Sequence, residues 1–391
     1  MDPVPDGAFG AGLPEGTLEH CIGVALAIGA LAGAQVSGVG VAVQVRLAEV
    51  MAAAYGSGQE MRPGRPVPAP GGGWLHADLT GPEDADAYDL VIGTLGTAPS
   101  AAQIARAAQE WRLAVCDYRP ARPPAPASSV FEVVPGTGGG RPFRVLDLTN
   151  MWAGPLATWL LQDLGAEVVK VEPSFRPDGF RARDGRGIHP GGRPCEPGRD
   201  SGMWNALNAG KQVVDLDLRR GGDRQRLVDL AAGSAIVVDT FSPRVMPNFG
   251  LADRPGGATR LAMPAFRADG PERDWVAYGT GVHAVAGLGD LGDGTFAAPA
   301  VAYPDPVGGF TAALAAVAAV AAGRVERAPA MISTSLEAAV AMLPDRPARD
   351  GSLGADPAGV GRRLLDRARS LGLMEDRPVC GRPLPHPRTV F

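Results

Sequence analysis

Two patterns of hydrophobic and polar positions alternate along the second half of the chain. Short apolar runs such as "FRVLDLT", "EVVKVE", "VVDLDL", "AIVVDTF" and "RLAMPAF" are separated by stretches with helical spacing, such as "GPLATWLLQDLG" and "GDRQRLVDLAAG". Strands that alternate with helices are typical of a parallel, doubly wound sheet. The pattern therefore predicts an α/β fold with a Rossmann-like parallel sheet domain over residues 143–345.

The regions on either side of this domain have a different pattern. Residues 1–118 combine helix-like stretches, such as "TLEHCIGVALAIGALAGA", with the strand-like "GGWLHADL" and the amphipathic "SAAQIARAAQEWRLAV", which predicts a smaller α+β segment. Residues 119–142 are dense in Pro and Gly, which predicts a linker without regular secondary structure. Residues 346–391 are expected to form a C-terminal extension.

The most apolar helical stretch has a carboxylate at its entrance. No side chain from Val307 to Ala322 is charged, which predicts a helix buried on most sides. Asp305 stands before it, between Pro304 and Pro306. An Asp followed by Pro is a common helix start, so Asp305 could act only as an N-cap. The partial positive charge of a helix N-terminus equally suits an ionised nucleophile, and the residues alone leave both roles open.

Composition and charge narrow the function classes. A net charge of -5 over 391 residues, without a block of basic residues, argues against a nucleic-acid partner. The N-terminus has no secretory signal pattern, and polar residues interrupt every stretch of about 18 apolar residues, so we expect a cytoplasmic protein with no membrane partner. The four cysteines lie far apart without a C-x-x-C pair, which indicates neither a metal site nor a disulfide framework.

Nucleotide-binding motifs are missing where such a fold would carry them. The turn after the first strand of the sheet domain, "DLTNMWAGPLA", has neither G-x-G-x-x-G nor a P-loop lysine, which disfavours NAD or ATP binding in the usual way. The chain has only two lysines, Lys170 and Lys211, in a background rich in arginine. Their retention hints that these two positions need an ammonium group.

Several motifs together resemble the class III CoA-transferase family, whose members include carnitine, bile-acid and formyl-CoA transferases. They are "VLDLTNMWAGPLATWLLQDLGAEVVKVEPSFRPDGFR", "NALNAGKQVVDLDL", "AIVVDTFSPRVMPNFGL" and the segment around Asp305, and the resemblance covers about residues 144–343. The N-terminal part resembles the segment that follows the sheet domain in ordinary members, which suggests a divergent, permuted or fused member. Because family members form interlocked dimers, the resemblance also implies a homodimer.

The resemblance implies a reaction and a nucleophile. Asp305, with Gly309 four residues on, matches the family's Asp that attacks an acyl-CoA thioester and passes through a mixed anhydride to an aspartyl-CoA thioester. The expected activity is transfer of CoA from an acyl-CoA donor to a carboxylic acid acceptor. Coenzyme A and acyl-CoA are then substrates, and no permanently bound cofactor is expected. The identities of the donor and the acceptor depend on pocket shape and cannot be deduced from the sequence.

The resemblance also implies contacts to CoA. Arg181, with Arg176 and Arg183 as neighbours, matches an arginine that reaches a CoA phosphate, and Lys211 lies in the family's "LN-x-G-K" stretch. Arginine and lysine suit phosphate, although each of these residues could equally be a solvated surface cation.

A further family motif is altered. In "DTFSPRVMP", Thr240 replaces the family's Asn, while Phe241 is retained as a candidate for packing on CoA. Phe241 could equally be a core aromatic at the end of a strand. The family's Gly is replaced by Arg244, which alters the usual loop.

Two other functions stay as alternatives. Racemases of this family place a His-Asp pair upstream of the catalytic Asp, but Tyr278 and Gly279 occupy the matching positions. His283 lies nearby, and a lone histidine in such a context is more often structural. An acyl-CoA racemase or epimerase is therefore the first alternative, and a non-catalytic CoA-binding subunit is the second.

Overall fold

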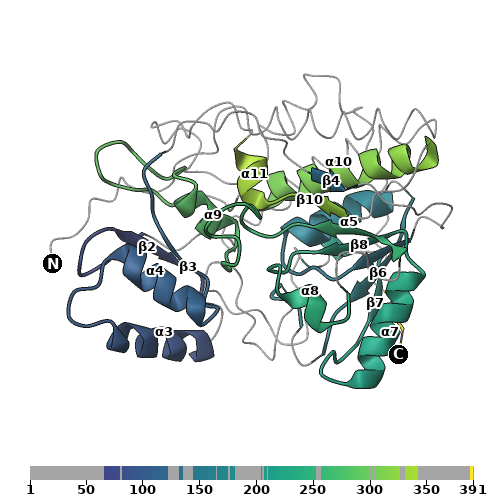
Figure 1. Ribbon diagram of the computed structural model, residues 1–391, viewed down its shortest axis with the longest axis horizontal. Helices are drawn as coiled ribbons and strands as arrows, with labels where there is room; N and C mark the ends of the chain where they lie inside the picture. The colour runs from purple at the N-terminus through teal and green to yellow at the C-terminus, as the bar shows by residue number, and fades with distance from the viewer. Residues whose placement is uncertain are drawn as a thin grey trace, which may run out of the picture.

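Two β-sheets organise the part of the chain that the structure describes (Figure 1). One has three strands and belongs to the N-terminal unit, and the other has eight and forms the main domain. The computed structural model describes residues 66–79, 82–121, 132–134, 144–163, 165–174, 177–180, 204, 207–208, 210–251, 257–299, 302, 304–325, 331–341 and 388–390.

The larger sheet has the order β11-β7-β6-β5-β8-β9-β10-β4, and each neighbouring pair is parallel except β10 with β4. From β5 in the middle of the sheet, the chain moves outward through β6 and β7 and then returns to build the other side from β8, while β4, which precedes β5, lies at an edge. The order reverses between β5 and β8, which is where ligands bind in open α/β sheets. The strands are β4 (Glu132–Val134), β5 (Arg144–Asp147), β6 (Glu167–Val171), β7 (Gln212–Val214), β8 (Ile236–Asp239), β9 (Thr259–Ala262), β10 (Met331–Ser333) and β11 (Arg388–Val390).

Helices cover both faces of this sheet. Alternate strand residues point to opposite faces, so Val145 packs in one core and Leu146 in the other. In Figure 1, α5 (Ala153–Asp163) and α10 (Pro304–Val325) lie on one face of the sheet. The helices α7 (Gly221–Ala232) and α8 (Val245–Asn248) lie on the opposite face. The predicted α/β class with a Rossmann-like sheet is confirmed.

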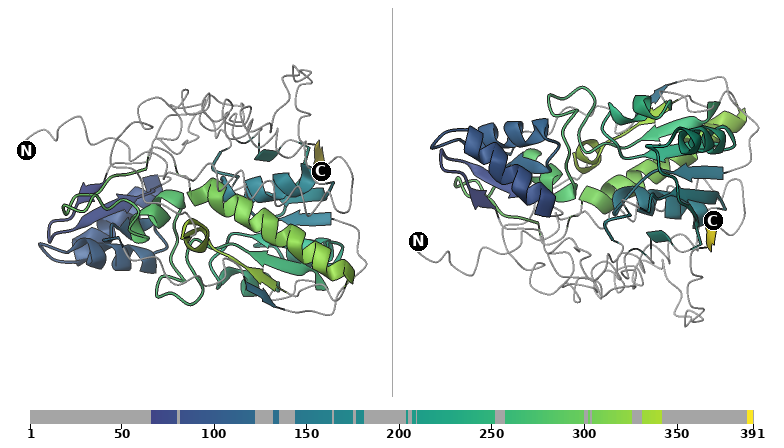
Figure 2. Two further views of the ribbon diagram at one scale, coloured as in Figure 1. Left: turned by 90° about the horizontal axis from the view of Figure 1, so that it is seen from above. Right: turned by 90° about the horizontal axis from the view of Figure 1, so that it is seen from below.

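A smaller unit lies beside the sheet domain, and a short helix lies between the two (Figure 2). Gln109 ties the unit to the segment before that helix, because its amide donates to Val276 O at 2.8 Å and accepts from Val276 N at 2.7 Å. The unit comprises β1 (Val67–Pro68), β2 (Trp74–Ala77), α3 (Pro82–Thr94), α4 (Ala101–Glu110) and β3 (Val115–Asp117), and the short helix is α9 (Gly279–Val285).

The uncharged helix predicted from the sequence is α10, and two glycines let it pack closely. Each glycine inside a helix costs about 1 kcal/mol relative to alanine. Here the absence of a side chain allows close approach to two neighbouring helices. A Cβ on Gly308 would overlap Leu336 of α11 (Leu336–Val340), and a Cβ on Gly309 would lie 2.6 Å from Ala153 O. The start of α10 therefore lies directly against the start of α5.

One expectation about the flanking regions needs correction. The predicted linker, 119–142, was expected to have no regular secondary structure, but it contains β4, which pairs with β10 at one edge of the sheet. The predicted extension, 346–391, contributes β11, which pairs with β7 at the opposite edge. Unpaired sheet edges attract additional strands, so segments remote in sequence can complete the sheet.

Other expectations stay predictions. These are the domain boundaries and the homodimer. The helix-like stretches predicted before residue 66 lie outside the described residues. Within the part of the chain that the structure describes, no helix has both the length and the apolar character needed to cross a membrane.

Substitution of Gly309 by alanine should destabilise the fold. The added methyl group meets the backbone of Ala153, and such overpacking costs about 1–3 kcal/mol, more than the helix propensity gained. Gly222→Ala in α7 is the matched control, because a Cβ there meets nothing within 4 Å. Urea unfolding should show a loss for Gly309→Ala and no loss for Gly222→Ala. Equal effects of the two substitutions would contradict the close crossing of α10 and α5.

Candidate active site

Asp305 lies in the first turn of α10 with only 9% of its surface exposed. Its Oδ2 accepts a hydrogen bond from Gly279 N of α9 at 3.2 Å. The carboxylate therefore contacts the start of a neighbouring helix, instead of folding back to cap the helix that carries it. This placement disfavours the N-cap alternative.

Gly279 must be a glycine in this arrangement. A Cβ at this position would lie 2.5 Å from Asp305 Oδ2 and 2.9 Å from its Cγ. Gly279 also occupies the position at which a racemase of this family would carry its Asp. A side chain there would displace Asp305, so the arrangement leaves no room for a second base at residue 279.

The environment of Asp305 opposes its negative charge. Burial raises the pKa of Asp305 most, the Gly279 hydrogen bond lowers it, and the charge of Asp78 raises it further, to about 7. An ordinary Asp carboxyl has a pKa near 3.8. At neutral pH Asp305 is therefore close to equally divided between its ionised and its protonated forms.

Asp78 follows β2 and belongs to the N-terminal unit. Its Oδ2 accepts from Thr280 Oγ1 at 2.6 Å, and its Oδ1 lies 3.0 Å from Nε2 of the buried His76. No motif in the sequence singled out Asp78. The available signal was the spacing of His76 and Asp78 in "WLHADL", because residues two apart on a strand share one face.

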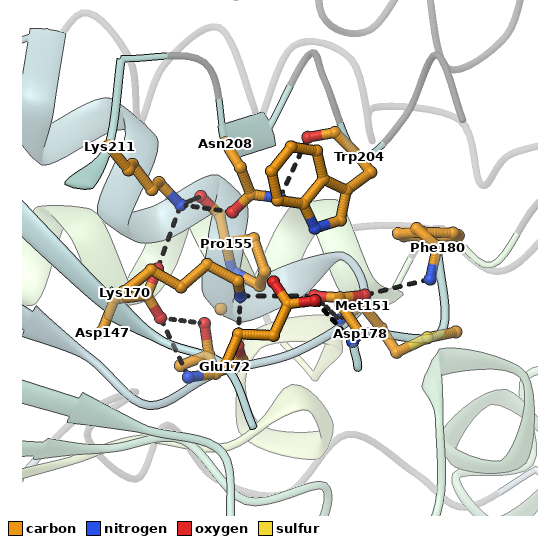
Figure 3. A network of polar contacts seen from close by, with 12 residues as sticks. Asp147, Met151, Pro155, Lys170, Glu172, Asp178, Phe180, Trp204, Asn208 and Lys211 are labelled. Carbon is orange, nitrogen blue, oxygen red and sulfur yellow. Dashed lines mark hydrogen bonds and ion pairs between the residues drawn. The ribbon is translucent and has the colours of Figure 1, made fainter. Parts of the chain in front are cut away.

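A buried network of charges lies at the carboxyl ends of β5 and β6 (Figure 3). Lys211 and Asp147 are both fully buried, and Lys211 Nζ lies 3.0 Å from Asp147 Oδ2. Lys211 Nζ also lies within hydrogen-bonding distance of Pro155 O, Thr158 Oγ1 and Asn208 Oδ1. An ammonium group has only three donors, and four protein oxygens surround this one.

The predicted role of Lys211 as a CoA-phosphate ligand does not fit this placement. The sequence pattern showed that a lysine follows Asn208 and Gly210, but it did not show that the side chain points inward beneath α5. A second lysine completes the network: Lys170 Nζ donates to Thr149 O at 2.6 Å and lies 3.3 Å from Asp178 Oδ2. Both lysines of the chain are thus internal.

The network fixes two loops at this end of the sheet. Asp178 accepts hydrogen bonds from Met151 N in the loop after β5 and from Phe180 N in the loop after β6. Met151 has a φ of 66°, a left-handed conformation that is uncommon outside glycine. The Asp178 contact holds this turn, from which α5 begins.

The ionisation states within the network follow from burial and neighbouring charge. Burial raises the pKa of Asp147, but the ammonium groups of Lys211 and Lys170 outweigh burial and hold the pKa well below its usual range. Burial lowers the pKa of Lys211 to about 8, against the opposing effect of Asp147. Both partners are therefore charged at neutral pH.

The start of α5 connects the network with Asp305. Lys211 donates to Pro155 O within the first turn of α5, and Gly309 of α10 packs on Ala153 of the same turn. The buried charges therefore support the turn against which the Asp305 helix is packed.

The predicted CoA contacts have different outcomes. Arg176, Arg181 and Arg183 lie outside the described residues. Thr240 and Phe241 follow β8 and are partly buried, and the Phe241 ring packs edge to face on Phe249 with 5.9 Å between the centroids. This packing favours the core-aromatic alternative for Phe241, and CoA contact by Thr240 and Phe241 stays a prediction.

His283 has the structural role that the sequence favoured. It is fully buried in α9, and its Nε2 lies 3.0 Å from Ala297 O. Burial lowers the pKa of His283 to about 4, so the imidazole is neutral at physiological pH.

The chain is a member of CoA-transferase family III, whose family model matches residues 141–370, more than half of the chain. This membership confirms the resemblance inferred from the motifs. Asp78 lies outside the matched residues.

Individual relatives match over shorter stretches. A probable fatty acyl-CoA transferase of Mycobacterium tuberculosis is 34% identical over 151 residues, which cover 37% of this chain and 36% of the relative. A succinyl-CoA:mesaconate CoA-transferase of Haloarcula hispanica is 39% identical over 106 residues, which cover 27% of this chain and 25% of the relative. The chain thus aligns with about a third or less of the length of these two relatives.

Solved structures include a similar but distant chain. A hypothetical protein from Mycobacterium tuberculosis is 27% identical, and the match covers 53% of this chain and 57% of that chain. Its TM-score of 0.41 is too low to support an argument about function.

Replacement of Lys211 by methionine should be strongly destabilising. Removal of one partner of a buried ion pair leaves an uncompensated charge, here that of Asp147, and typically costs about 3–5 kcal/mol. The exposed Arg226 pairs with Asp223, and Arg226→Gln should cost less than about 1 kcal/mol. Denaturant unfolding of both variants measures the difference. A Lys211→Met variant of normal stability that binds CoA poorly would restore the phosphate role.

Replacement of Asp305 by asparagine should change how stability depends on pH. The folded-state pKa of Asp305, about 7, exceeds the ordinary value of 3.8. The contribution of Asp305 to the free energy of unfolding is therefore fully present below pH 3.8 and is lost as the pH rises through 7. The wild-type protein should therefore lose about 2–4 kcal/mol across this window relative to Asp305→Asn. Urea unfolding at several pH values measures this difference, and parallel pH profiles of the two proteins would be inconsistent with the buried charge.

Proposed function

We propose that the protein transfers CoA from an acyl-CoA to a carboxylic acid, with Asp305 as the covalent carrier. The observation that carries this proposal is a buried carboxylate whose ionised form is destabilised, at the start of the α10 helix, in a member of CoA-transferase family III. Such a carboxylate is more basic than an exposed one, and greater basicity favours nucleophilic attack.

The first half of the reaction loads CoA onto the protein. The Asp305 carboxylate attacks the thioester carbonyl, the C–S bond breaks, and a mixed anhydride and a CoA thiolate result. The thiolate then attacks the carbonyl carbon of Asp305, which breaks the anhydride C–O bond. The donor acid leaves as a carboxylate, and an aspartyl-CoA thioester remains.

The second half reverses these steps with a different acid. The acceptor carboxylate attacks the aspartyl thioester and displaces the CoA thiolate, which then attacks the acyl carbon of the new anhydride. The new acyl-CoA leaves and Asp305 is regenerated as a carboxylate, so no net proton transfer occurs. The Gly279 N–H, 3.2 Å from Oδ2, is placed to stabilise negative charge that develops on this oxygen when the Asp305 carbonyl is attacked.

The proposed substrates are an acyl-CoA and a free carboxylic acid. The names of the two relatives describe transfer involving fatty acyl-CoA in one case and succinyl-CoA and mesaconate in the other. Arg176, Arg181 and Arg183 remain the proposed phosphate contacts for CoA, and Thr240 and Phe241 remain proposed CoA contacts as well. The family's interlocked homodimer is part of this proposal.

The alternatives have less support. Racemisation would need a second base, and a side chain at residue 279 would collide with Asp305. A purely CoA-binding subunit would not need a buried carboxylate with a destabilised charge. Neither function is proposed.

Asp305→Asn tests the proposed carrier directly. The variant should lose transferase turnover by about 10³-fold or more, because it lacks the nucleophile. Mass spectrometry after incubation with a panel of acyl-CoAs should show a covalent adduct on wild type that is absent from the variant. Asp86→Asn, on an exposed face of α3, should retain both adduct and turnover. Turnover within about twofold of wild type in a folded Asp305→Asn protein would refute the covalent role.

A further inference from the structure

Consecutive residues at the start of α9 bind two different carboxylates. Gly279 N donates to Asp305 Oδ2 at 3.2 Å, and Thr280 Oγ1 donates to Asp78 Oδ2 at 2.6 Å. Asp305 comes from the sheet domain and Asp78 from the N-terminal unit. Because the residues that bind them are adjacent, the fold holds two negative charges near each other in a largely buried region.

We propose that Asp78 is a positioning residue that destabilises the negative charge of Asp305 and so makes it a stronger nucleophile. This inference rests on the proposed function of Asp305 as the covalent carrier. The N-terminal unit, which lies outside the matched family region, would then take part in the chemistry of the sheet domain.

The physical reason is the loss of charge during acylation. Ionised Asp305 and Asp78 repel one another, and solvent screens this repulsion only partly because Asp305 is buried and Asp78 is half-buried. Formation of the anhydride neutralises Asp305, so the repulsion is relieved as the reaction proceeds. A group that raises the energy of the free carboxylate but not that of the acylated form lowers the barrier to acylation.

The geometry supports a persistent effect. Asp78 is fixed by Thr280 on one oxygen and lies 3.0 Å from His76 Nε2 on the other, and the Gln109 contacts to Val276 hold the two units together. The charge of Asp78 is also among the causes that raise the pKa of Asp305.

Other ionisable groups near Asp305 come from the elements packed on α10. α9 carries His283, which is buried and neutral, and α11 carries Glu337, whose Oε2 accepts from Arg267 N at 3.1 Å. α5 has no ionisable side chain from Ala153 to Gln162. In the described part of the chain, Asp78 with its neighbour His76 is therefore the group to vary.

Asp78→Asn should produce crossed pH profiles of acylation. Without the neighbouring charge, Asp305 ionises at lower pH but is less basic. A tenfold loss of basicity lowers nucleophilicity by about threefold, so at about pH 9 the variant should acylate more slowly than wild type by about this factor. At about pH 5.5 it should acylate faster, because more of its Asp305 is ionised. Rapid-quench mass spectrometry of Asp305 acylation measures both rates.

The controls separate charge from structure. Asp78→Glu keeps the charge and should restore the profile toward wild type, and Asp86→Asn removes an exposed acidic charge from the same unit and should leave the profile unchanged. Asp78→Ser is a second, smaller neutral variant, which is used if Asp78→Asn disturbs the contact with Thr280. Parallel profiles for wild type and both neutral variants, without a crossing, would overturn the proposal.

A second measurement does not depend on catalysis. A double-mutant cycle of unfolding free energies for Asp78→Asn and Asp305→Asn should show coupling at about pH 8 that disappears at about pH 4.5, where Asp305 is protonated. Coupling of equal size at both pH values overturns the charge effect. If wild type is acylated but the pH-dependent coupling is absent, the proposed role of Asp78 is overturned and the proposed function of Asp305 is not. If the coupling is present but wild type is never acylated, the proposed function of Asp305 is overturned, and so is the proposed effect of Asp78 on the acylation rate.

Discussion

The burial of one carboxylate, Asp305, is the constraint around which the site is built. A single charge taken out of water is expensive unless other groups compensate it, and here a backbone N–H from Gly279 is the described contact that favours the ionised form. The fold supports this costly group with a tightly packed helix, in which Gly308 and Gly309 allow α10 to lie directly on α11 and α5. The packing of α10 thus offsets the cost of removing the Asp305 carboxylate from water.

The second set of buried charges has the opposite character. Lys170 pairs with Asp178 and Lys211 with Asp147, so these buried charges compensate one another and the set acts as a scaffold. It fixes the loops at the carboxyl ends of β5 and β6 and supports the first turn of α5. The described part of the chain therefore contains a region where buried charges are paired and a region where burial opposes the charge of Asp305, and α5 links the two.

The sequence predicted the parts of this arrangement that depend on local pattern. Apolar runs and helical spacing predicted the parallel sheet, and the uncharged stretch after Asp305 predicted the buried helix. Contacts between distant segments were not predictable, because burial and pairing depend on the tertiary fold. Lys211 was predicted to contact a CoA phosphate, and no motif in the sequence singled out Asp78. The strands β4 and β11 were missed since Pro- and Gly-rich segments carry little pattern, and sheet edges recruited them.

The fold keeps Asp305 only partly ionised at neutral pH. Infrared difference spectroscopy of wild type against Asp305→Asn across a pH titration tests this ionisation state most directly, because the C=O stretch of a protonated carboxyl group disappears on ionisation. We expect one carboxyl band, present in wild type and absent from the variant, to disappear with a midpoint near pH 7. A midpoint near the ordinary value of 3.8 would contradict it.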